Sequence, residues 1–338
     1  MKKRIVTFLL ATVLMFSFSA CQKIADEPEN NGDKTNGTKK ITFCLDYTPN
    51  TNHTGVYVAK NLGYFKDAGF DVEIVQAGES TSALVIGAGQ AQFGIEYQDT
   101  MAAALIGDAP LGITAVAAIL QHNTSGIMSL KGNGISSPKG LSGKTYSTWD
   151  SPIELATLKS VVNSDGGDFS TVKLIPNTLT DEPGALKEHQ TDAIWVFYGW
   201  GGIYAELQGV EIDFFQFADI DPVFDYYTPC IVANDDYLKN NPEDARKFMQ
   251  AVKKGYEYAI ANPKAAADIL MEEEPDLKSS SELIYASQEW ISTQYQADAA
   301  SWGIIDPARW NTFYRWLTEN DLVTSPLSDG MGFSCDYL

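Results

Sequence analysis

The sequence is poor in cysteine, in histidine and in positive charge. Its 338 residues include four cysteines and three histidines, and 24 Lys and Arg stand against 44 Asp and Glu, for a formal net charge of −20. The few, widely spaced cysteines exclude a disulfide framework and a short-spaced zinc motif. The acidic excess argues against binding to nucleic acid or to anionic lipid headgroups, because both require clustered positive charge.

Long apolar runs are missing after the first 20 residues. Residues 5–18 are apolar and follow Lys2-Lys3-Arg4, which is the layout of an export signal, because the run is too short and wrongly flanked for a membrane span. Ser19-Ala20-Cys21 resembles a bacterial lipobox, although Phe18 stands where an aliphatic residue is usual. We therefore predict a lipoprotein signal peptide over residues 1–20 and lipidation of Cys21, with an ordinary secretory signal as the alternative. The lipid would hold the protein outside the cytoplasm on a bacterial membrane.

Residues 21–40 contain almost nothing that could be buried, and we predict a disordered tether there. From Ile41 onward, strand and helix patterns alternate, which favours an α/β fold with mostly parallel sheets. The expected strands are 41–45, 71–75, 92–96, 113–120, 144–148, 172–175, 193–198 and 212–217. The chain then ends in a helical segment, with helices expected at 242–260, 263–271, 280–295 and 307–320.

Two crossings, near residues 129–135 and 226–232, divide this pattern into two lobes. We predict that residues 41–130 and 231–338 form one lobe and that residues 131–230 form the other. Such a double crossover is typical of a clamshell that closes on a ligand by hinge motion.

The loops that follow the strands share one composition. Each combines aromatic residues with amides or carboxylates, and none contains Lys or Arg. In an open α/β sheet, ligands bind at the carboxyl ends of the strands. The candidate ligand-binding residues are therefore Asp46, Tyr47, Asn50, His53, Glu96, Tyr97, His122, Asn123, Trp149, Ser151, Tyr198, Trp200, Asp225 and Tyr226.

This composition predicts the chemistry of the ligand. An anion would need Arg or Lys, so we expect a flat, neutral or weakly basic heterocycle. The rings of Tyr47, Trp149, Tyr198 or Trp200 would stack on it, each pair adding about 0.5–1.5 kcal/mol beyond burial. Carboxylates such as those of Asp46, Glu96, Asp150 and Asp225 would accept hydrogen bonds from ring amino groups. We interpret Phe197 and Tyr227 as core residues, because they have strand-like spacing, and we expect Thr54 to cap the first helix.

Catalysis has little support in the sequence. His53 and His122 occur in these loops without the spacing of a metal site, and His189 belongs to a charged helix face. The sequence contains no nucleophile elbow, no Walker-type loop and no dinucleotide-binding glycine pattern. We therefore expect neither an enzyme nor a bound cofactor or metal.

The stretch from Leu45 to Gly55, Leu-Asp-Tyr-Thr-Pro-Asn-Thr-Asn-His-Thr-Gly, resembles the signature of the ThiY-type solute-binding proteins of ABC importers. These proteins capture a thiamine precursor, formylaminomethyl-aminopyrimidine. The segments 121–126, 197–200 and 225–229 are similar to family segments too, and the resemblance runs from Ile41 to Leu322. Tyr47 departs from the family, which usually has Trp at this position, so a stacking role here would involve less ring area.

The resemblance implies a type II periplasmic-binding-protein fold, with two α/β lobes, a double-crossover hinge and a helical C-terminal segment. It also implies a monomer that works with an ABC permease and an ATPase and that touches the membrane only through its lipid. A hydroxymethylpyrimidine, riboflavin or another heterocycle is an alternative ligand, whereas alkanesulfonates are disfavoured by the acidic loops. The superfamily includes the eukaryotic pyrimidine-phosphate synthase, an enzyme that consumes its own histidine and pyridoxal phosphate, but nothing here resembles its cysteine-rich run.

Overall fold

The computed structural model describes residues 38–107, 109–177, 179 and 181–338. The predicted signal peptide at 1–20, the predicted lipidation site Cys21 and nearly all of the predicted tether lie outside the described residues. The first strand, β1 (Lys39–Leu45), begins two residues before the expected start of the fold. Within the described part of the chain, no helix has the length and apolar character that a membrane span requires.

The first lobe is built on a five-stranded sheet in which four strands share one direction. The strand order is β2-β1-β3-β10-β4; β1 pairs in parallel with β2 and β3, and β10 runs antiparallel to both β3 and β4. Both faces of the sheet are covered, so β1 buries Phe43 and Cys44 alike and shows no alternation between buried and exposed residues. The remaining strands of this sheet are β2 (Phe70–Gln76), β3 (Phe93–Glu96), β4 (Ile113–Ala118) and β10 (Cys230–Asn234).

The second lobe repeats this plan with the order β7-β6-β8-β5-β9. Here β6 pairs in parallel with β7 and β8, and β5 is the reversed strand between β8 and β9. In each lobe the reversed strand is the one that arrives from the other lobe, which confirms the predicted double crossover. The strands are β5 (Ser125–Leu130), β6 (Thr145–Thr148), β7 (Lys173–Pro176), β8 (Ala193–Phe197) and β9 (Ile212–Gln216).

The position predicted for the first crossing is wrong. The chain leaves the first sheet at Ala118 and joins the second at Ser125, so residues 125–130 belong to the second sheet and not to the first lobe. The apolar sequence of β5 is compatible with either sheet. Its pairing partners, β8 and β9, come much later in the chain, so the sequence of β5 alone does not identify them. Adjacent residues Ile127 and Met128 contribute to the cores on opposite faces of the sheet, as strand geometry requires.

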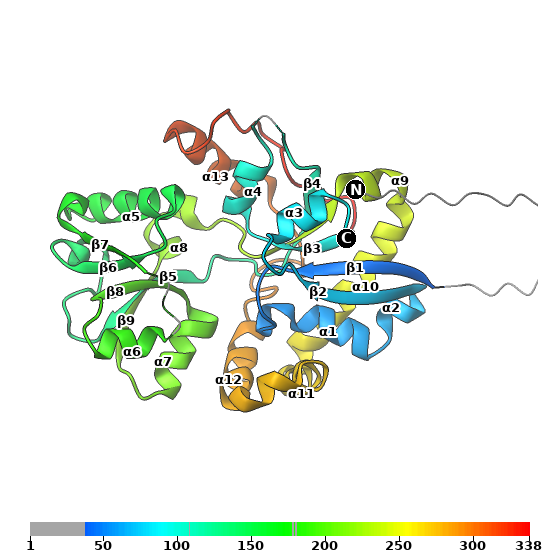
Figure 1. Cartoon of the computed structure of the whole chain (residues 1–338), viewed down its shortest axis with the longest axis horizontal. Helices are drawn as coiled ribbons and strands as arrows, with labels where there is room; N and C mark the ends of the chain where they lie inside the picture. The colour runs from blue at the N-terminus through cyan, green and yellow to red at the C-terminus, as the bar shows by residue number, and fades with distance from the viewer. Residues whose placement is uncertain (1–37, 108, 178, 180) are drawn as a thin grey trace, which may run out of the picture. The chain divides into compact units, whose positions relative to one another are not determined.

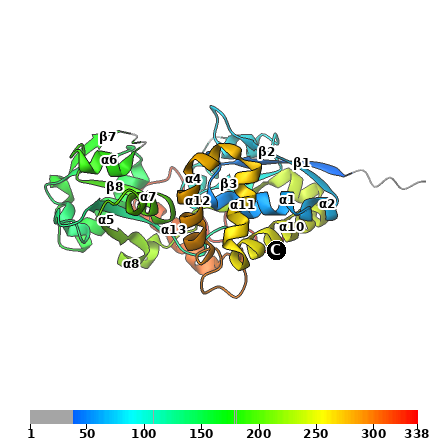
Figure 2. The ribbon, with the colours of Figure 1, turned by 90° about the horizontal axis from the view of Figure 1, so that it is seen from below.

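Helices cover both faces of each sheet (Figure 1). In the first lobe, α1, α10 and α11 pack on one face, and α3, α4 and α13 pack on the other (Figures 1 and 2). In the second lobe, α5 and α8 lie opposite α6 and α7. The helices are α1 (Thr54–Asn61), α2 (Tyr64–Asp67), α3 (Ser82–Gly87), α4 (Gln98–Ala104), α5 (Pro152–Ser164), α6 (Glu182–Lys187), α7 (Ile203–Leu207), α8 (Phe217–Ile220), α9 (Asp235–Asn240), α10 (Pro242–Ala261), α11 (Pro263–Glu273), α12 (Ser281–Ser292) and α13 (Pro307–Glu319).

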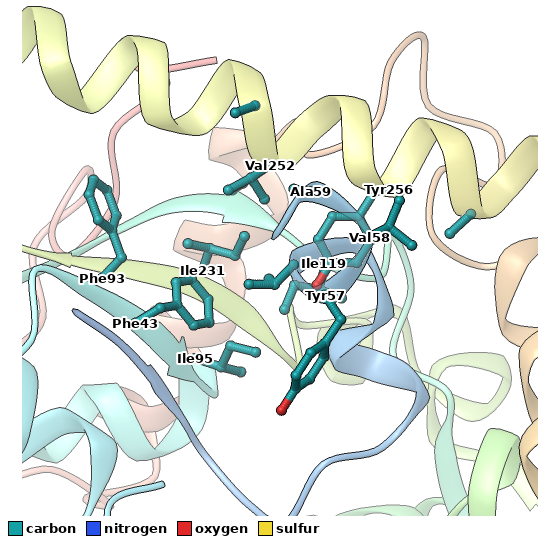
Figure 3. Close-up of a cluster of buried hydrophobic side chains, with 14 of the residues drawn as sticks. Phe43, Tyr57, Val58, Ala59, Phe93, Ile95, Ile119, Ile231, Val252 and Tyr256 are labelled. Carbon is teal, nitrogen blue, oxygen red and sulfur yellow. The ribbon is translucent and has the colours of Figure 1, made fainter. Parts of the chain in front are cut away.

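The core under α10 supports the loop after β1. Figure 3 shows Phe43, Phe93, Val252 and Tyr256 in this core, between the sheet, α1 and α10. The hydroxyl of Tyr256 donates a hydrogen bond to the Asn52 carbonyl at 2.7 Å, which ties the loop to α10. The loop is therefore anchored by the largest buried cluster of its own lobe.

Candidate ligand-binding site

A cavity of about 710 Å³ lies between loops of the two lobes. Its volume is in the range of sites for small organic ligands. It opens at the carboxyl ends of β1, β3, β6 and β8, where the α/β fold places ligand sites. The lining residues are Tyr47, Thr48, Asn50, Thr51, Asn52, Tyr97, Thr124, Trp149, Glu182, Trp195, Val196, Phe197, Gly199, Trp200, Gly201, Pro229 and Ile291.

The loop after β1 forms one wall of the cavity, and hydrogen bonds within the loop fix its shape. The Asn50 side chain accepts the backbone N–H of Asn52 at 2.9 Å and donates to the Thr48 carbonyl at 3.0 Å. Asn50 thereby caps a short 3₁₀ helix, η1 (Thr51–His53), that precedes α1. Thr54, which we expected to be the cap, is already in α1 and donates its hydroxyl to Gln288 at 2.6 Å.

Asp46 and His53 lie behind this wall and not in it. His53 is fully buried; its Nδ1 accepts the Asn50 backbone N–H at 3.2 Å, so Nε2 carries the proton and donates to Asp46 Oδ1 at 2.8 Å. The other oxygen of Asp46 accepts a hydrogen bond from the Tyr97 hydroxyl. Burial would raise the pKa of Asp46, but the adjacent His53 and the hydrogen bonds from His53 and Tyr97 lower it below its ordinary value.

Aromatic rings from both lobes surround the cavity. Tyr47 in the first lobe and Trp149 in the second are 69% and 50% exposed. Deeper in the site, the rings of Tyr97 and Phe197 face one another with centres 6.4 Å apart and planes 20° apart. A flat ligand therefore has aromatic surface available on two opposite sides.

Two acceptors in the wall lack a strong partner. Asn52 Oδ1 is buried, and no described residue donates a hydrogen bond to it. Glu182, the first residue of α6, has a raised pKa because burial disfavours its charge. Neither Lys nor Arg nor His is among the described residues that line the cavity. The described lining thus includes residues with acceptor groups, Asn52 and Glu182, which suit a ligand with donor groups, and it has no cationic side chain for an anionic ligand.

Five of the fourteen predicted site residues line the cavity: Tyr47, Asn50, Tyr97, Trp149 and Trp200. Whether they contact a ligand stays a prediction. Trp200 is partly buried and also packs against the core of the first lobe, so it bridges the two lobes. The structure places the other nine, Asp46, His53, Glu96, His122, Asn123, Ser151, Tyr198, Asp225 and Tyr226, outside the lining.

Glu96 points into the first lobe. Its carboxylate accepts hydrogen bonds from the Ser82 hydroxyl, from the Ala83 backbone N–H at 2.8 Å and from the Thr100 hydroxyl at 2.7 Å. These donors come from α3 and α4, so Glu96 joins the two helices to the end of β3. In this arrangement its hydrogen-bonding capacity is taken up by the protein.

His122, Asn123 and Asp225 lie in the segments that cross between the lobes. His122 Nδ1 is 2.8 Å from Asp225 Oδ2, and Asp225 Oδ1 accepts the Asn123 backbone N–H at 2.9 Å. The Asn123 side chain donates to the Phe224 carbonyl at 2.8 Å. All three residues therefore hold the two crossing segments together.

The remaining three have local structural partners. Ser151 precedes α5, and its backbone N–H donates to the Glu154 carboxylate at 3.2 Å. The Tyr198 hydroxyl donates to Glu206 at 2.5 Å. Tyr226 is 3% exposed and stacks on Phe313 with ring centres 4.0 Å apart.

Several lining residues were missed at the level of sequence. The interpretation of Phe197 as a core residue is wrong, because it ends β8 and lines the cavity, whereas Tyr227 is buried as expected. Glu182 follows β7 and could have been found by the same strand-end rule that identified the other loops. Thr124 and Pro229 lie in segments 121–126 and 225–229, which resemble the family, whereas Ile291 carries no such signal, since only the tertiary fold brings it to the cavity.

Comparison with known proteins assigns the family. The model of the family described as "NMT1/THI5 like" matches residues 50–266. The formylaminopyrimidine-binding protein of Halalkalibacterium halodurans is 25% identical over 334 residues, covering 98% of each chain. A 4-amino-5-hydroxymethyl-2-methylpyrimidine phosphate synthase of Saccharomyces cerevisiae is 28% identical over 264 residues, covering 72% of this chain and 73% of its own.

A solved structure supports the fold. The ligand-binding component of an ABC-type import system from Staphylococcus aureus superposes with a TM-score of 0.63 at 16% identity, covering 86% of this chain and 94% of that one. The two-lobed type II periplasmic-binding fold expected from the sequence is thereby confirmed. By the family match, which spans more than half of its length, the chain belongs to the NMT1/THI5-like family.

Proposed function

We propose that this protein is the extracytoplasmic solute-binding component of an ABC importer and that it captures an aminopyrimidine precursor of thiamine. The ligand would be of the formylaminomethyl-aminopyrimidine or hydroxymethylpyrimidine type. The similarity to a formylaminopyrimidine-binding protein over nearly the whole chain supports this assignment.

One observation carries the choice of ligand. Asn52 lines a cavity with aromatic rings on both sides, and its Oδ1 is a buried acceptor to which no described residue donates a hydrogen bond. A buried acceptor left without a hydrogen bond costs about 1–3 kcal/mol, so a ligand gains up to that amount when the Asn52 side chain turns Oδ1 toward its donor group. The exocyclic amino group of an aminopyrimidine is such a donor, and the flat ring matches the aromatic walls. Glu182 offers a second acceptor on the side of the other lobe.

The partners follow from the class of protein. A solute-binding protein of an importer delivers its ligand to a permease whose transport is driven by an ATPase. We propose that this chain does so as a monomer, with a lipid on Cys21 as its contact with the membrane. The Cys21→Ser variant should then be found in the soluble extracytoplasmic fraction; if it stays with the membrane, the lipid anchor is refuted.

Calorimetric titration tests the ligand. The purified protein should bind formylaminomethyl-aminopyrimidine tightly, thiamine and riboflavin weakly, and taurine not at all. The Asn52→Ala variant should lose at least tenfold in affinity, whereas Asn61→Ala, at the far end of α1, should bind like the wild type. Tight riboflavin binding without a pyrimidine signal would instead make the protein a carrier of another heterocycle.

An enzymatic role is the second candidate, because relatives at 28% identity are named as pyrimidine-phosphate synthases. Incubation with pyridoxal phosphate and iron should yield no pyrimidine phosphate if the protein is a carrier. Formation of the product, detected by mass spectrometry, would overturn the transport assignment.

A further inference from the structure

Tyr97 and Phe197 form a pair of rings that spans the cavity between the lobes. Tyr97 follows β3 in the first lobe, and Phe197 is the last residue of β8 in the second. Both line the cavity, and their planes are within 20° of parallel. Since each ring belongs to a different lobe, a hinge motion changes the gap between them.

The position of Tyr97 is fixed from behind. Its hydroxyl donates to Asp46, whose other carboxylate oxygen accepts from His53 Nε2 at 2.8 Å. The side chains of His53 and Asp46 are 0% and 3% exposed, so this chain of hydrogen bonds is shielded from water. Because the hydroxyl is already used, Tyr97 offers the cavity the face of its ring and not a polar group.

The position of Phe197 is fixed by its backbone. Phe197 pairs with Ser125 of β5, and the next residue, Tyr198, donates its backbone N–H to the Thr124 carbonyl at 3.1 Å. The chain then turns through Gly199, where an added Cβ would lie only 2.8 Å from the Trp290 ring. The close packing of this turn leaves the end of β8 little freedom to move.

The gap between the two rings is close to that needed by a third. Carbon atoms in van der Waals contact are about 3.5–4.0 Å apart, so a flat ring held between two others needs about 7–8 Å. The ring centres of Tyr97 and Phe197 are 6.4 Å apart, which is less than this span, so the two lobes must separate before a ring can enter between them. By contrast, Tyr47 and Trp149 are largely exposed and sit where water competes for their surface.

We propose that Tyr97 and Phe197 are the specificity-determining clamp that holds the two faces of the ligand's ring, and that Asp46 and His53 are positioning residues that act through Tyr97. The proposal rests on the proposed function for the identity of the ring. In this proposal Tyr97 and Phe197 take the main stacking role that loop composition predicts for the exposed residues Tyr47 and Trp149.

The first test compares matched leucine variants by calorimetry with formylaminomethyl-aminopyrimidine. Phe197→Leu should lower affinity at least tenfold, whereas Tyr47→Leu should lower it less than threefold. Thermal unfolding of both variants checks that they are folded. A loss at Tyr47 equal to or larger than the loss at Phe197 would overturn the clamp.

The second test asks whether Asp46 acts through Tyr97. Tyr97→Phe keeps the ring and removes its hydrogen bond to Asp46. If Asp46 only positions that ring, adding Asp46→Asn to Tyr97→Phe should lower affinity less than threefold further, although Asp46→Asn alone lowers it several-fold. Fully additive losses would show that Asp46 acts independently and would refute its positioning role.

These outcomes are separable from failure of the proposed function. If the wild type binds riboflavin and not the pyrimidine, the transport assignment changes and the same variants are titrated with riboflavin. The clamp then still requires the larger loss at Phe197. If the wild type binds the pyrimidine and Phe197→Leu binds it equally well, the clamp fails and the proposed function stands.

Discussion

His122 Nδ1 lies 2.8 Å from Asp225 Oδ2, and this contact joins the two segments that cross between the lobes. The other ring nitrogen of His122 is 2.9 Å from Asp298 Oδ1, in the loop between α12 and α13. Arg309 on α13 approaches Asp225 to 3.5 Å from another side. The crossing segments are therefore fastened to each other and to the helical C-terminal part of the chain.

The charge on His122 should make the stability of this cluster depend on pH. Burial would lower the pKa of His122, but hydrogen bonds with Asp225 and Asp298 raise it above its ordinary value, despite the nearby Arg309. Because the folded state then binds the proton more tightly, the stabilisation is present below about pH 6.5 and is lost as pH rises through the higher folded-state pKa. We expect the deficit of His122→Asn in free energy of unfolding, about 1 kcal/mol at pH 5.5, to shrink at pH 8.5.

Urea unfolding of wild type and variant at the two pH values measures this difference. His189→Asn, at a residue without a salt bridge in the described chain, serves as the control and should show no such trend. A deficit at His122 that is the same at both pH values would mean that the imidazole contributes by packing and not by charge.

The close approach of α1 and α10 predicts a sensitive position at Gly255. A Cβ added there would lie 1.9 Å from the Gly55 carbonyl oxygen, so alanine must push the helices apart. We expect Gly255→Ala to lower the free energy of unfolding by about 1–3 kcal/mol, as overpacked cores do. Lys254→Ala, exposed on the same helix, should change it by less than about 0.5 kcal/mol in the same denaturation experiment. Equal stabilities would contradict the packing of α1 on α10.

Glu96 should affect stability and not ligand affinity. The Glu96→Gln variant places an amide donor against groups that themselves donate, the Ser82 hydroxyl and the Ala83 N–H among them. We expect a loss of about 1–3 kcal/mol in unfolding free energy, with affinity for the pyrimidine within about twofold of wild type. Thermal unfolding and calorimetry on the same sample separate the two effects. A tenfold loss of affinity at unchanged stability would restore the original expectation that Glu96 binds the ligand.

The sequence was sufficient to predict the two lobes and the ends of the strands where the cavity lies, because alternation of strands and helices and the composition of the loops are local properties. It could not show which face of a loop each side chain takes. Asp46 and Tyr47 are adjacent, yet the more polar Asp46 is buried behind the wall and the aromatic Tyr47 is largely exposed. That difference depends on His53 and Tyr97, which reach Asp46 only in the folded chain.

The same limit explains the misplaced crossing. Residues 125–130 form an apolar run that fits either sheet. They join the second sheet because they pair with β8 and β9, whose residues lie about 65 to 90 positions later in the chain. Phe197 was assigned to the core for a similar reason: alternation along β8 identifies which residues share a face, but not that the face opens on a cavity beyond the end of the strand.

Glu182 offers a final prediction in which binding and stability change in opposite directions. Burial raises the pKa of its carboxyl, so ionisation of Glu182 makes the ligand-free protein less stable. This cost is absent below the unfolded-state pKa, grows as pH rises through the folded-state pKa and is complete above it. Glu182→Gln removes the charge and should therefore raise the melting temperature at pH 7.5, with little change at pH 4.

The same variant should bind the aminopyrimidine at least fivefold more weakly at pH 7.5, because the ionised carboxylate is a stronger acceptor of the ligand's amino group than an amide oxygen is. Glu188→Gln, on the exposed end of the same helix region, is the matched control and should change neither quantity. Differential scanning calorimetry and titration together decide the outcome. A variant that melts higher and binds equally well would show that Glu182 lines the cavity without contacting the ligand, and a variant that melts lower would show that its charge supports the start of α6 instead.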